Sequence, residues 1–174
     1  MALAIYHPLN DEYPERFQKE IELVNYPELI SGMEISAVET IEFLSKIKEE
    51  KLHFRYAEDK WTIKEVWQHV NDTERVLSYR AMCYARKEIK TLPGFDEDAY
   101  ALHSNSNKRS WHEIIDEFSK IRASSIALFK SMDIDMLSQI GYAGVSTVIT
   151  TRAVGFLILA HEIHHKKIIF ERYL

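Results

Sequence analysis

Apolar side chains recur every three or four residues along most of this chain, which is the spacing of one face of an α-helix. The pattern predicts four long helices, at about residues 27–50, 62–87, 110–132 and 151–172. Shorter helices are expected at about 14–24 and 96–102, and the β-branched residues of 146–151 favour an extended segment. Strand signals are otherwise nearly absent, so the sequence predicts an all-α protein.

Start signals accompany three of the long helices. Thr62 with Glu65, and Ser110 with Glu113, match the capping box, in which a Ser or Thr is followed by Glu three residues later. Pro27 suits the first turn of a helix because its ring presets the backbone angle φ. These signals support helix starts near the three positions.

The second predicted helix has an apolar face and a polar face. The apolar face carries Ile63, Val66, Val70, Leu77 and Ala81. The opposite face carries Lys64, Gln68, Asn71, Arg75 and Ser78. Because surface helices show this division, we expect the polar face to contact solvent.

A polar connection of about twenty residues, TLPGFDEDAYALHSNSNKRS, follows this helix. Connections of this length in compact proteins are more often functional than idle. We expect residues 92–100 to form a wall of a binding pocket, with Phe95 and Tyr100 as apolar contacts and a solvated acidic run, Asp96, Glu97 and Asp98, between them.

These elements favour a four-helix bundle with one long crossover connection. The chain of 174 residues contains no internal repeat and no linker-like run, which predicts a single domain over residues 1–174. Bundles often hold metals and cofactors between facing helices.

Two histidines lie in the middle of the last helix's inner apolar stripe, which contains Val154, Leu157, Ile158 and Ile168. His161 and His165 are four residues apart, so they lie on one face, about 6 Å apart along the axis. Two such imidazoles form a common metal-binding pair. The alternative is a pair of hydrogen-bonded core histidines. His164 points about 80–100° to one side, which favours a surface or supporting position.

A third ligand is expected from another helix. His69 lies at the edge of the second helix's apolar arc and is the strongest candidate. The predicted metal ligands are therefore His69, His161 and His165. Supporting positions around the metal are considered for Asp72, Glu74 and Glu162; for Glu74 an ordinary internal salt bridge, with Arg80 or Arg152, is the preferred interpretation.

A second apolar stripe on the last helix contains Phe156, Leu159, Ile163 and Phe170. A helix that is apolar nearly all round is buried on two sides. Either another segment of this chain or a second copy covers the stripe, so a homodimer is one of two expectations.

Composition narrows the function classes. The formal net charge is −5, without a Lys/Arg cluster, which argues against nucleic acid as a partner. The single cysteine, Cys83, forms no internal disulfide. We recognise no signal peptide, and no apolar run approaches the roughly 20 residues of a membrane span, so a cytoplasmic protein without a membrane partner is expected.

Three segments resemble the DinB-like superfamily, more closely its damage-inducible DinB branch: KWTIKEVWQHVNDTERVLSYRAMCYAR, LPGFDEDAY and GFLILAHEIHHKKIIFERYL. The specific motifs are W-T-I-x-E-x-x-x-H in the second helix and H-E-x-H-H in the last. The resemblance implies an up-down-down-up bundle with a long crossover. It also implies a divalent metal ion, nickel or zinc, bound by His69, His161 and His165, and frequent dimers.

The resemblance leaves several functions open. The first is a metal-dependent hydrolase that acts on a small molecule through a metal-activated water. The second is a metal-dependent thiol S-transferase that uses a low-molecular-weight thiol. The third is a non-catalytic metal-binding stress-response protein, and the last is a partner-binding bundle with structural histidines.

Overall fold

The computed structural model describes residues 3–144 and 147–174. Four long helices form a bundle: α2 (Leu29–Ser45), α3 (Ile63–Ala85), α5 (Trp111–Lys130) and α7 (Thr151–Arg172). Helix α3 packs against both α5 and α7, and α2 packs against the same two helices from the opposite side. The predicted all-α four-helix bundle is confirmed.

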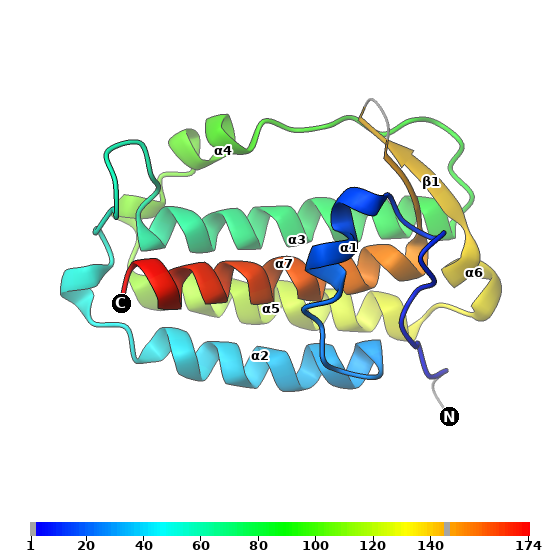
Figure 1. The fold of residues 1–174 in the computed structure, drawn as a ribbon, viewed down its shortest axis with the longest axis horizontal. Coiled ribbons are helices and arrows are strands. Elements are labelled where there is room, and N and C mark those ends of the chain that lie inside the picture. Colours follow the sequence, from blue (N-terminus) through cyan, green and yellow to red (C-terminus); the bar gives the residue numbers. More distant parts are fainter. Residues whose placement is uncertain (1–2, 145–146) are drawn as a thin grey trace.

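The direction of the helices gives the bundle its topology. Helices α3 and α5 run the same way along the bundle, whereas α2 and α7 run the opposite way (Figure 1). Two consecutive parallel helices need a connection that returns along the whole bundle. Residues 86–110 form this crossover, which contains α4 (Glu97–His103) and the 3-10 turn η3 (Ser106–Lys108). The predicted long crossover is therefore present.

Side-chain caps fix where the main helices begin. Thr62 and Ser110 each accept a hydrogen bond from the backbone N–H of the Glu three residues later, and each Glu accepts one in return, so both predicted capping boxes form. Glu28 caps α2, which begins two residues later than the predicted start at Pro27. Thr150 caps α7.

Short elements close the ends of the bundle. They are η1 (Glu15–Phe17), α1 (Gln18–Ile21), η2 (Glu49–Lys51), α6 (Ile134–Ser138), β1 (Ile140–Ala143) and β2 (Thr147–Thr150). The antiparallel hairpin pairs Ile140 with Thr150 and Ala143 with Thr147. The extended segment predicted near residues 146–151 is thus β2, although Ser146 itself lies outside the described residues; the strand β1 was not predicted.

A polar layer divides the core into two hydrophobic clusters. One cluster contains Leu77, Tyr84 and Phe156, and the other contains Trp67 and Phe118 at the opposite end of the bundle. Between them, all four helices contribute buried polar side chains: Ser36 and Thr40 from α2, Glu74 from α3, Arg122 from α5 and Glu162 from α7. The candidate functional site lies in this middle layer.

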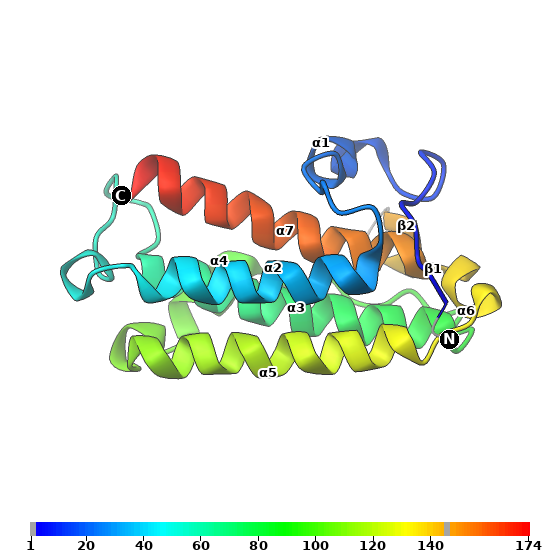
Figure 2. The same cartoon turned by 90° about the horizontal axis from the view of Figure 1, so that it is seen from below.

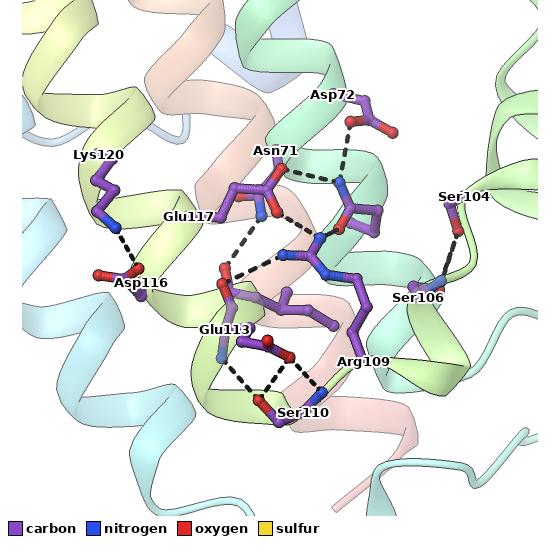
Figure 3. A network of polar contacts seen from close by, with 12 residues as sticks. Asn71, Asp72, Ser104, Ser106, Arg109, Ser110, Glu113, Asp116, Glu117 and Lys120 are labelled. Carbon is purple, nitrogen blue, oxygen red and sulfur yellow. Dashed lines mark hydrogen bonds and ion pairs between the residues drawn. The ribbon is translucent and has the colours of Figure 1, made fainter.

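The polar face of α3 is not solvated over its first half, so this prediction was wrong. Lys64, Gln68 and Asn71 are at most 5% exposed. Gln68 accepts a hydrogen bond from Arg109, which also forms an ion pair with Glu117 of α5 (Figure 3). The amide of Asn71 donates to the carbonyl oxygen of Ile114 over 3.1 Å, and the ammonium of Lys64 donates to the carbonyl oxygen of Arg109 over 2.8 Å. A hydropathy pattern cannot distinguish polar contacts between helices from contacts with water.

The second apolar stripe of α7 is covered at its N-terminal half by the chain's own N-terminal region. Helix α1 lies over this part of α7 (Figure 2). The ring of His7 packs on Phe156 with centroids 4.3 Å apart, and Phe156 and Leu159 are fully buried. At the other end, Phe170 is 68% exposed. The homodimer stays a prediction.

Within the described residues, no helix combines the length and the apolar character needed to cross a membrane.

Candidate metal centre

Three histidine rings converge where α3 faces α7. The Nε2 atoms of His69 and His161 are 2.9 Å apart. The ring centroid of His165 lies 4.9 Å from that of His69 and 4.5 Å from that of His161. One ligand atom from each ring lies within 4.8 Å of the other two. The structure therefore brings together the three residues that the sequence predicted to meet.

Helix geometry accounts for the convergence. His161 and His165 are one turn apart on α7, so both face α3. On α3, the positions of His69, Thr73 and Leu77 repeat every four residues and all line the same cavity. Because α3 and α7 are antiparallel neighbours with capped N-termini, their packing fixes which turns meet.

Burial keeps the three imidazoles neutral. His69 is only 4% exposed, and its desolvation lowers its pKa to about 4, weakly opposed by the charge of Asp98. Desolvation, together with the neighbouring rings, lowers the pKa of His165 to about 3 and that of His161 well below its usual value. Neutral imidazole is the form that binds a metal ion, so these rings need not release protons on binding.

The donor set fits a divalent transition metal. Two ligands about 2.0–2.1 Å from a tetrahedral zinc ion lie about 3.3 Å apart, close to the 2.9 Å between the Nε2 atoms of His69 and His161. The buried Nδ1 of His165 has no hydrogen-bond partner among the described residues. In a purely structural histidine cluster that nitrogen would stay unpaired, at a cost of about 1–3 kcal/mol, whereas a metal ion bound through it would supply a partner. Three imidazoles suit zinc or nickel better than calcium or magnesium, which prefer oxygen ligands.

His164 lies beside the cluster rather than in it. Its ring packs edge-on against His165 with centroids 5.1 Å apart, but it is outside the group of converging ligand atoms. This is the lateral position that the 100° turn per residue predicts.

The histidines form part of the lining of an open cavity of about 360 Å³. The other lining residues come from η1, α1, α3, the crossover, α7 and the segment before α3: Phe17, Glu20, Trp61, Thr73, Leu77, Arg80, Phe95, Glu97, Leu157 and His164. The prediction that residues 92–100 wall the pocket is confirmed for Phe95. Tyr100 instead packs on Phe95, with centroids 5.2 Å apart, and lines neighbouring cavities.

Sequence reasoning missed the role of Glu20 and underestimated Glu97. Both carboxylates line the cavity, although the acidic run that contains Glu97 had been expected only to be solvated. Glu20 lies on the short helix α1, and nothing in its local pattern indicates that α1 folds back over α7. Only the tertiary arrangement places these acids beside the histidines.

Behind the histidines, a buried ion network links three helices. Arg122 Nη2 lies 2.8 Å from Glu74 Oε2, and Arg122 Nη1 lies 2.7 Å from Glu162 Oε2. Ser36 and Thr40 donate hydrogen bonds to Glu162. Burial alone would lower the pKa of Arg122, but the charges of Glu162 and Glu74 outweigh it and raise that pKa.

The internal salt bridge expected for Glu74 is confirmed, but both predicted partners were wrong. Arg80 donates to the carbonyl oxygen of Pro93, and Arg152 pairs with Glu12. The actual partner, Arg122, lies on α5, and no local pattern indicates which arginine of another helix reaches Glu74. In the part of the chain that the structure describes, Glu74 and Glu162 form no hydrogen bond with a histidine ring, and neither does Asp72, which accepts from Gln68.

The class of protein is defined by a four-helix bundle whose second and third long helices, α3 and α5, are parallel, together with a three-histidine cluster. The profile of the DinB superfamily matches residues 33–169, and the chain belongs to this family. No curated protein matches the chain. The chain is similar in structure to YfiT from Bacillus subtilis, described as a probable metal-dependent hydrolase with an unusual four-helix bundle topology. The TM-score is 0.72 at 18% sequence identity, and the match covers 95% of this chain and 90% of that chain. At this identity the likeness shows the fold alone.

Proposed function

We propose that this protein is a metal-dependent hydrolase of a small molecule, with His69, His161 and His165 as the metal ligands. The observation that carries the proposal is the convergence of three neutral imidazoles on the wall of an open cavity. A site with three protein ligands leaves a coordination position for water or substrate, which is the pattern of catalytic rather than structural zinc sites.

The protein's own residues would hold and shield the reacting groups. The three rings fix the position of the metal, which when bound lowers the pKa of a coordinated water to about 7. Trp61 packs against the ring of His69, with centroids 4.8 Å apart, and Phe95 lines the cavity with it. These apolar groups limit the access of bulk water and strengthen electrostatic interactions in the site. The description of YfiT as a probable metal-dependent hydrolase agrees with this proposal.

The activity test uses protein purified without a histidine tag and loaded with zinc or nickel. Metal-loaded wild type is expected to hydrolyse at least one member of a panel of chromogenic esters, amides and phosphoesters, and a chelator is expected to abolish the reaction. The activity of the variant His161→Ala should fall by more than about 100-fold, because even residues that merely support a metal ligand contribute about 10–100-fold to metal affinity or activity. His112→Ala, which changes an exposed histidine on α5, is the matched control and should retain activity.

A parallel assay with an electrophilic dye and several cofactor thiols separates the alternatives. Metal-dependent thiol conjugation without hydrolysis would contradict the proposal in favour of an S-transferase. Full metal occupancy with neither activity would instead favour a non-catalytic metal-binding protein.

A further inference from the structure

Among the described residues, the side chain of Glu20 has no polar partner, which distinguishes it from the other half-buried carboxylates. In the described ranges, 3–144 and 147–174, its side chain forms no ion pair and no hydrogen bond. The others each bind an arginine, a backbone N–H or both: Glu12, Glu28, Glu65, Asp72, Glu88 and Glu117. Glu20 therefore lines the cavity without a partner from the described residues, which leaves its carboxylate free to bind a ligand.

Glu97 meets Glu20 at the same cavity. Glu20 comes from α1 and Glu97 from the first turn of α4, so two distant segments bring the carboxylates together. Partial desolvation raises the pKa of Glu97, and the charges of Asp98, Glu20 and Asp96 add to the effect. Glu97 is solvent-accessible, and its side chain likewise forms no ion pair among the residues described.

The positive group on the same wall does not neutralise this pair. Arg80 also lines the cavity, but its guanidinium donates to the carbonyl oxygen of Pro93 over 2.9 Å, and it lies beyond ion-pair distance of both carboxylates. The two acids therefore face the cavity with uncompensated negative charge.

Further features of the cavity point to a bound molecule. His69, only 4% exposed, reaches the same cavity, so the carboxylates and the metal ligands line one shared space. Three aromatic rings, Phe17, Trp61 and Phe95, line it, and aromatic faces attract organic cations. Its volume of about 360 Å³ suits a small molecule. Among the described residues, Glu20 and Glu97 belong to no group of three or more converging metal-ligand atoms, which favours an ammonium group over a second metal ion.

We infer that Glu20 and Glu97 form a subsite for a cationic amine, so that the substrate of the proposed enzyme is a small molecule with a protonated amino group beside the part that reaches the metal. That the amine is a substrate rests on the proposed function, whereas binding of an amine at this subsite requires no catalysis. The subsite adds a specificity determinant to the cavity, because neither carboxylate forms an ion pair among the described residues.

The test compares benzylamine, which is protonated at pH 7, with benzyl alcohol, which has nearly the same size and no charge. Titrations of zinc-loaded protein followed by amide chemical shifts in NMR measure even weak dissociation constants. Wild type is expected to bind the amine at least about tenfold more tightly, because hydrogen bonds to charged groups are the stronger ones. Glu20→Gln and Glu97→Gln should each remove most of this preference, and Glu15→Gln, an exposed acid of the neighbouring turn, should retain it.

Each outcome decides the matter. Equal affinity for the two probes in wild type would overturn the inference, as would a preference that survives in both Gln variants. Chemical shift changes should centre on α1 and α4, and changes confined to another surface would also overturn it. Amine binding in a protein that hydrolyses nothing would leave the subsite standing while the proposed function fails. Hydrolysis of neutral substrates alone, without amine preference, would have the opposite meaning.

Discussion

Replacing Arg122 with methionine is expected to lower the free energy of unfolding by about 3–5 kcal/mol, the largest effect of any single substitution considered for stability. Methionine keeps an unbranched chain of similar length but removes the charge that Glu74 and Glu162 share. Two carboxylates, each at most 3% exposed, would remain buried without a counter-charge. The free energy of unfolding of a natural domain is about 5–15 kcal/mol, so the variant would lose a large part of its stability.

Urea denaturation at pH 8 and pH 5 checks this result. Removing Arg122 raises the pKa of the buried Glu162 carboxyl group in the folded protein, because its charged form loses the guanidinium that lowers this pKa. Folded protein then takes up protons more readily than unfolded protein as the pH falls, so the destabilisation should be smaller at pH 5.

The matched control for Arg122→Met is Arg75→Met. Arg75 also joins α3 to Glu117 of α5, but its side chain is 50% exposed, and its loss should cost under about 1 kcal/mol. A loss of less than about 1 kcal/mol for Arg122→Met at pH 8 would show that the network does not hold the middle of the bundle together.

Substituting His161 with alanine is expected to abolish stabilisation by metal. For wild type, zinc at about 100 times its dissociation constant should add about 2.7 kcal/mol. In a chain of this size that corresponds to an increase in Tm of about 5–10 °C. Loss of one ligand weakens binding by more than about 100-fold. At the same zinc concentration, His161→Ala should gain less than about 0.5 kcal/mol, or under about 2 °C.

Differential scanning calorimetry with and without zinc measures both increases, and each variant is compared with its own metal-free Tm. His112→Ala should show the full wild-type increase, because its side chain is exposed on α5 and does not belong to the converging cluster. An undiminished increase in His161→Ala would mean that the ion binds elsewhere.

Much of the fold was predictable because its signals are local. The four long helices follow from apolar spacing, and the two capping boxes, at Thr62 and Ser110, formed as their residue types require. The convergence of His161 and His165 follows from one turn of helix. These predictions depend on a few neighbouring residues, so the sequence contains what is needed.

The parts that were missed depend on contacts between distant segments. The first half of the polar face of α3, with Gln68 and Asn71, is buried, although its polar pattern is the same as that of a solvated face. Arg122 of α5 is a buried cation only because Glu74 and Glu162 reach it from two other helices. Periodicity reports which side of a helix is apolar, and it does not report which polar side chains find partners.

The same limit applies to the cavity. The spacing of its histidines predicts their convergence, whereas Glu20 reaches the cavity only because α1 folds back over α7. Such acids carry the specificity of a site, and their positions depend on how connecting segments fold back over the bundle.

The most direct test of the central claim is the anomalous scattering of crystals of untagged protein grown with zinc, measured on both sides of the zinc absorption edge. The account predicts one strong peak between α3 and α7, about 2.0–2.1 Å from one ring nitrogen of each of His69, His161 and His165. A strong peak at other residues, or no peak at these three histidines at saturating zinc, would contradict it.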